Sequence, residues 1–422
     1  MKKIRKRVIV SLCALSLVVL CIRFFGAEIL TSTAASQMSK GKYGSAAKSA
    51  DAALFLEPEN REARLVYIKA LTNLPPSVSV QKAIFDFTQS KHFDEADNIA
   101  EAKVLEWRNF ALKKTGKNYI LHAPMDTLVM HWDKNSFPLT VSFVRETKVP
   151  EYYEMRARAA FETWEKESHG FFKFRFSDNN ADIVVKFVPL GLSGKGERGY
   201  LGNPAFTVPD IKKNKLEKMT IYMHNTNRYN RYYPDEAVYT FILHEIAHAL
   251  GVMGHSPDPN DLMYMSNIAS VVVGVETQIQ KADLNTLYLL YSLVPDITNT
   301  DNYDTKGQIY APIILGSKQD IIARKIDEAR EYIKNAPFQV SGYIDLAVLY
   351  ASAKKYDEAE KALNSGLNVS KNQQEKYLIY YNFAILQMEK NAPHSALEYA
   401  KQAQSINNNP EIQALIEEIK KS

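Results

Sequence analysis

Cysteine is nearly absent from this chain of 422 residues. The two cysteines, Cys13 and Cys21, both lie in an apolar run near the N-terminus. The remainder of the chain therefore folds without disulfides. The composition is otherwise ordinary for a globular protein, and the length predicts two or three domains with ample core.

A basic excess is also missing from most of the chain. The formal net charge is +4, but five of the first seven residues are basic, which leaves the remainder at −1. This balance gives no reason to expect a nucleic-acid partner. The basic cluster and the apolar run at 8–22 instead predict that residues 1–26 form an uncleaved membrane anchor or a cleaved signal peptide. Both alternatives place the bulk of the chain outside the cytoplasm.

Histidine is scarce, yet two of the nine histidines, His244 and His248, stand four residues apart in an apolar segment. Pro234 suits the start of a helix here, and Gly251 suits its end. On a helix, this spacing puts both rings on one face, where they can reach one zinc ion. Glu245 lies on the flank of that face. A buried helix that left these polar groups unused would be costly, which disfavours a purely structural interpretation.

The residues after the predicted helix extend this pattern. The motif comprises His244, Glu245, His248, Gly251, His255 and Ser256. Met263 follows eight residues after His255. This arrangement resembles the matrixin branch of the metzincin zinc endopeptidases, over roughly residues 138–294. The resemblance implies one catalytic zinc ion above a tight turn at Met263. It also allows for structural calcium, to which the sequence assigns no residues.

The third metal ligand departs from the spacing of that family. The family places its third histidine three residues after the glycine, where this chain has Gly254, and His255 comes one residue later. Asp258 and Asp261 are the other candidates within reach. His255 is favoured because a neutral imidazole matches the first two ligands, and because its distance to Met263 is that of the family. Latency through a propeptide cysteine, as in many animal matrixins, is excluded by the cysteine count.

Residues 118–296 are predicted to form an α+β, metzincin-like domain with a twisted mixed sheet and the active-site helix. The expected elements are strand 138–143, helix 149–167, strands 171–176, 181–188 and 219–223, the zinc helix, and a closing helix at 281–293. Residues 199–202 fall where the family has a substrate-pairing edge strand, with a surface loop as the alternative. The loop before them lacks histidine, so no second zinc is predicted, and His224 is expected at the surface.

Both flanks of this domain are predicted to be all-α. We expect helical hairpins in residues 27–117 and 319–422. The polar segment 297–318 is predicted to be a linker. In the C-terminal flank, alanines recur at an interval of 37 residues: Ala347 and Ala384, Ala359 and Ala396. Small residues at such intervals resemble tetratricopeptide repeats (TPR), whose paired antiparallel helices bind proteins. Generic helical hairpins are the alternative, and the N-terminal match, at Ala46, Ala50 and Ala53, is weaker.

These features predict an extracytoplasmic zinc-dependent endopeptidase. His244, His248 and His255 hold the metal and leave a fourth position for water, whose proton Glu245 takes and passes to the leaving amine. The expected partners are protein or peptide substrates, a protein bound by the repeats, and the membrane at the N-terminal segment. Two alternatives stay open: a TPR-type binding scaffold with a residual metalloprotease domain, and a zinc hydrolase of non-peptide substrates.

Overall fold

A computed structural model describes residues 25–421 except 126, 179–180, 191–203, 228 and 265–276. Nearly all of the predicted anchor or signal segment, and the predicted edge strand at 199–202, lie outside the described residues. Among the helices that are described, none is long and apolar enough to cross a membrane.

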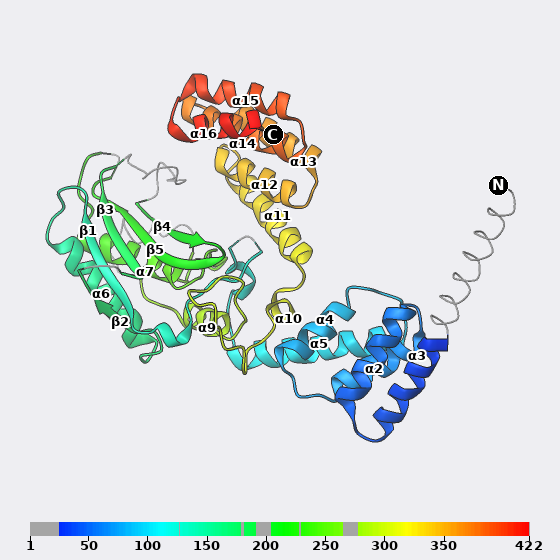
Figure 1. Cartoon of the computed structure of the whole chain (residues 1–422). Helices are drawn as coiled ribbons and strands as arrows, with labels where there is room; N and C mark the ends of the chain where they lie inside the picture. Colours follow the sequence, from blue (N-terminus) through cyan, green and yellow to red (C-terminus); the bar gives the residue numbers. More distant parts are fainter. Residues whose placement is uncertain are drawn as a thin grey trace, which may run out of the picture.

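A five-stranded sheet forms the core of the domain at the left of Figure 1. Its strands are β1 (Leu139–Arg145), β2 (Phe174–Phe176), β3 (Ile183–Val188), β4 (Ala205–Lys212) and β5 (Lys215–His224). Their order is β2-β1-β3-β5-β4, and all neighbours are parallel except the antiparallel pair β4–β5. The mixed sheet predicted from the sequence is therefore confirmed, with β2 shorter than expected.

The edge strand β4 was not predicted from the sequence. Most of its side chains are half-buried, so the strand has no clear alternation of apolar and polar residues. It also contains Pro209, which cannot donate a ladder hydrogen bond and is tolerated in edge strands. Both features hide a strand from pattern analysis, although both are compatible with the edge of a sheet.

Two long helices of this domain, α6 (Tyr152–Glu167) and α7 (Asp235–Ala249), lie against each other, and α7 also contacts β4 and β5. The α6 face expected to be buried is fully buried; it consists of Tyr153, Ala157, Ala160 and Trp164. The Trp164 indole Nε1 donates to the carbonyl of Leu243 at 2.9 Å and so joins the two helices. The domain also contains α9 (Lys281–Leu290) and two short 3-10 helices, η1 (Ile120–His122) and η2 (Lys134–Ser136).

The flanking regions are helical and project from the sheet domain in different directions (Figure 1). The N-terminal region has helical residues 25–39 followed by α2 (Tyr43–Leu56), α3 (Arg61–Thr72), α4 (Val78–Phe87) and α5 (Glu95–Thr115). The C-terminal region has α11 (Lys318–Asn335), α12 (Val340–Ser352), α13 (Tyr356–Val369), α14 (Gln373–Glu389), α15 (Pro393–Ile406) and α16 (Pro410–Lys421). Helices α12 and α13 pack together, as do α14 and α15. The four alanines that recur at 37 residues are all buried, at 3% exposure or less.

Part of the segment predicted to be a linker, 297–318, is packed into the core. It contains the short helix α10 (Ala311–Leu315), whose residues belong to the same hydrophobic cluster as the sheet and as Phe85 and Ala111 of α4 and α5. Arg108 Nε donates to the carbonyl of Ile313 at 2.7 Å. The polar composition of the segment suggested a linker, but its apolar stretch supplies buried contacts between the N-terminal helices and the sheet domain.

Candidate metal centre

Helix α7 carries the first two histidines, and its ends agree with the sequence. Pro234 is the residue that precedes the helix, and the last helical residue is Ala249. Gly251 has a φ of 114°, and a Cβ atom there would lie 2.2 Å from the carbonyl oxygen of Met130. Only glycine fits this backbone conformation and this close approach, so the helix ends where the sequence predicted.

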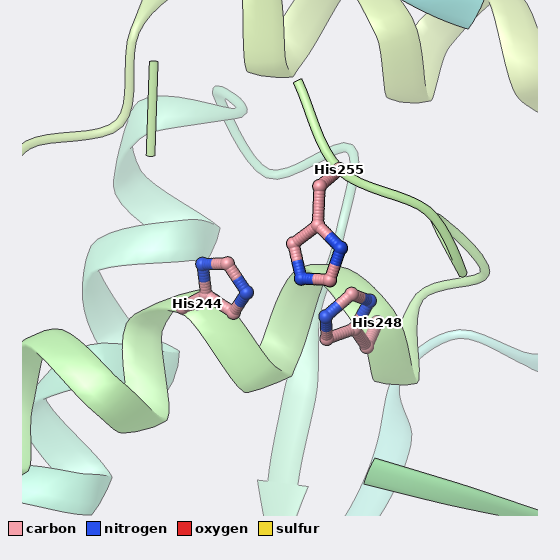
Figure 2. A group of neighbouring side chains, drawn as sticks. All are labelled: His244, His248 and His255. Atoms are coloured by element: carbon pink, nitrogen blue, oxygen red, sulfur yellow. The ribbon is translucent and has the colours of Figure 1, made fainter. Parts of the chain in front are cut away.

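Three histidine rings face one another at one point (Figure 2). The ligand atoms of His244, His248 and His255 all lie within 4.8 Å of one another. The distances between ring centroids are 4.9 Å for His244–His248, 5.3 Å for His244–His255 and 5.0 Å for His248–His255. Among the described residues, this is the group whose spacing could hold a metal ion.

The two aspartates weighed as third ligand have other partners. The Asp258 carboxylate accepts a hydrogen bond from Lys117 Nζ at 2.6 Å, and this ion pair lowers its pKa to about 2. The Asp261 carboxylate accepts from the hydroxyl of Ser256, also at 2.6 Å. The structure therefore brings His255, and neither aspartate, to the two histidines of α7.

Hydrogen bonds orient the rings of α7 for metal binding. Nδ1 of His244 lies 2.9 Å from the carbonyl of Leu262, and Nδ1 of His248 lies 2.5 Å from the carbonyl of Val252. A proton on each Nδ1 satisfies these carbonyls and leaves the lone pair on Nε2 for a metal. Burial also lowers the pKa of His244 to about 4 and that of His255 to about 3. Neutral imidazole is the metal-binding form, so this donor set fits zinc.

Gly254 explains how the chain accommodates one extra residue before His255. A Cβ atom at Gly254 would lie 1.8 Å from the carbonyl oxygen of His122, and the neighbouring Met253 N–H donates to the carbonyl of Ala123 at 2.8 Å. This glycine permits a close backbone-to-backbone contact, which holds the loop as it turns back toward the metal centre.

The turn at Met263 is held by a buried acid that the sequence analysis did not single out. The Asp283 carboxylate accepts from the backbone N–H of Leu262 at 3.1 Å and of Met263 at 3.4 Å, and from the hydroxyl of Tyr119 at 2.7 Å. Asp283 is fully buried, and it also accepts from the N–H of Gln280 in a capping box at the start of α9. The sequence feature that could have identified Asp283 is its position in the first turn of a predicted helix, where acids often cap the backbone.

Glu245 lies between the two histidines of α7 and is 6% exposed. Burial raises the pKa of its carboxyl group to about 7, against the lowering effect of a hydrogen bond from Thr207. The Thr207 hydroxyl donates to Glu245 Oε2 at 2.7 Å. A buried carboxyl with a pKa near neutrality beside three histidines is suited to proton transfer.

His224 is not at the surface, contrary to the sequence-based prediction. It is 4% exposed at the end of β5, and its ring is edge-on to Phe206 with centroids 6.1 Å apart. Its backbone N–H donates to the carbonyl of Pro204, because β5 lies inside the sheet beside β4. His224 is not part of the three-histidine group.

Comparison with known families agrees with this geometry. Residues 131–292 match the family model described as matrixin. This part of the chain is a matrixin domain. The match spans the sheet, α7, the three histidines and the Met263 turn, and it supports a zinc metallopeptidase in general. No curated protein matches the chain.

Proposed function

We propose that this protein is a zinc-dependent endopeptidase with Glu245 as its general base. The convergence of His244, His248 and His255 carries the proposal, because three imidazoles with an acid beside them form a hydrolytic zinc site with an open position. The matrixin match supports peptide or protein substrates.

Each residue of the site has its own role in the proposed reaction. When bound, zinc supplies Lewis acidity that polarises a peptide carbonyl and acidifies a water molecule. His244 and His248 would hold it through Nε2, since their Nδ1 atoms face backbone carbonyls, and His255 would be the third ligand. Glu245 takes the proton of the attacking water and passes it to the departing amine. Met263 is buried and supports the site without acting as a ligand.

Digestion of a peptide library by the zinc-loaded full-length protein tests this function. We expect internal cleavage that stops when a chelator removes the metal and resumes when zinc is restored. One bound zinc without cleavage of any peptide would favour the scaffold with a residual metalloprotease domain. Turnover confined to non-peptide esters or amides would favour the other alternative.

We also infer that the chain works outside the cytoplasm, anchored or exported by residues 1–26, and that its helical flanks are TPR-like units that bind a protein. The basic and apolar N-terminal sequence supports the location, and the buried alanines at 37-residue intervals support the repeats. A membrane-impermeant lysine cross-linker applied to intact cells should join the chain to a protein partner. Reaction only after lysis would refute the location, and reaction without a protein adduct would refute the binding role.

A further inference from the structure

Thr207 connects the edge strand of the sheet to the metal centre. It lies on β4, opposite Ile221 of β5, and is half-buried. Its hydroxyl lies 2.7 Å from Glu245 Oε2 and 3.1 Å from the backbone carbonyl oxygen of Glu245. A hydroxyl has one hydrogen, so it can donate to only one of these two oxygens at a time. When Glu245 is ionised, its carboxylate oxygen is both the nearer and the stronger acceptor. Within the described residues, no other donor to this carboxylate is found.

We propose that Thr207 is a positioning residue that holds one carboxylate oxygen of Glu245, so that the other faces the reacting water. This inference rests on the function proposed above. The glutamate side chain has three torsions, and its terminal torsion is broad, so packing around the aliphatic part leaves the carboxylate plane free to turn. A charge-assisted hydrogen bond at Oε2 selects one orientation.

The alternative role for Thr207 is packing alone. A β-branched residue is favoured in a strand, and its methyl group fills space whether or not the hydroxyl donates. The two roles make different demands on the side chain. Positioning needs the hydroxyl, whereas packing needs the methyl group and the volume. Variants that separate the hydroxyl from the volume can therefore distinguish them.

Three substitutions in the full-length, zinc-loaded protein make this separation. Thr207→Val keeps the shape and removes the donor, while Thr207→Ala and Thr207→Ser differ from each other only by the hydroxyl. We expect the Val and Ala variants to lose about tenfold in kcat on a peptide substrate, with KM and zinc content unchanged. The Ser variant should stay within about twofold of the wild type. Thr220→Val, on the neighbouring strand β5, controls for the loss of a hydroxyl within the sheet.

A Ser variant as impaired as the Ala variant, or a Val variant with wild-type kcat, would overturn the positioning role. A change confined to KM would overturn it as well, because it would place Thr207 in peptide binding. If the Val variant does not fold, the Ser–Ala comparison decides alone. Glu245→Gln is assayed in parallel to separate the two proposals. If Glu245→Gln is active, Glu245 is not the general base. If Glu245→Gln is inactive and Thr207→Val is fully active, Glu245 remains the proposed base and only the positioning role of Thr207 is refuted.

Discussion

The Glu245→Gln variant is expected to bind zinc normally and to lose at least about 100-fold in kcat, the usual scale for removal of a general base. Glutamine has almost the same volume as glutamate, so the buried site on α7 should not change its packing. Its amide oxygen can still accept the hydrogen bond from Thr207. The amide cannot take a proton from water, however, so the substitution removes only the proton transfer from the attacking water. Steady-state kinetics on a peptide from the library, with zinc content by elemental analysis, measure the effect.

Glu236 offers a matched control for this experiment. It is an acid on the same helix, in the first turn of α7, and it is not part of the metal group. Glu236→Gln makes the same change of charge and should leave kcat within about twofold, because this carboxylate lies at the helix N-terminus and is not part of the metal group. Proteolysis by Glu245→Gln at a rate near that of the wild type would show that another group takes the proton.

The His255→Ala variant is expected to lose both zinc and activity. Removal of its ring leaves two imidazoles, and a catalytic zinc site needs three protein ligands. Loss of a residue that only supports a ligand costs about 10–100-fold in metal affinity, so loss of the ligand itself should cost more than about 100-fold. Competition with a metal-binding dye measures this affinity, and circular dichroism establishes that the variant is folded.

Asp258→Ala is the control for the third ligand, because Asp258 was the alternative nearest in sequence to His255. Its carboxylate pairs with Lys117, whose side chain is 68% exposed, so the loss of this pair should have little effect on fold or metal. We expect zinc affinity and kcat close to those of the wild type. The assignment of His255 would be wrong if His255→Ala kept its zinc while Asp258→Ala or Asp261→Ala lost it.

Local patterns in the sequence were sufficient for several parts of this protein. The four-residue spacing of His244 and His248 predicted their common face because a helix turns every 3.6 residues. Gly251 marked the end of α7, since only glycine adopts that backbone conformation cheaply. The buried face of α6 and the buried alanines of the C-terminal helices followed from the same periodicity. In each case the signal and its structural effect lie within one or two neighbouring elements.

Tertiary structure decided what depends on residues far apart in the chain. The contact of Gly254 with His122 holds the loop that carries His255, and no periodicity records it. Thr207 and Glu245 are 38 residues apart, and they meet only because β4 returns along the edge of the sheet beside α7. The segment 297–318 is polar overall, but it contains α10, whose apolar side chains are buried against helices about 200 residues earlier in the chain. Such contacts arise from the packing of whole elements against one another, whereas sequence patterns report only the periodicity within each element.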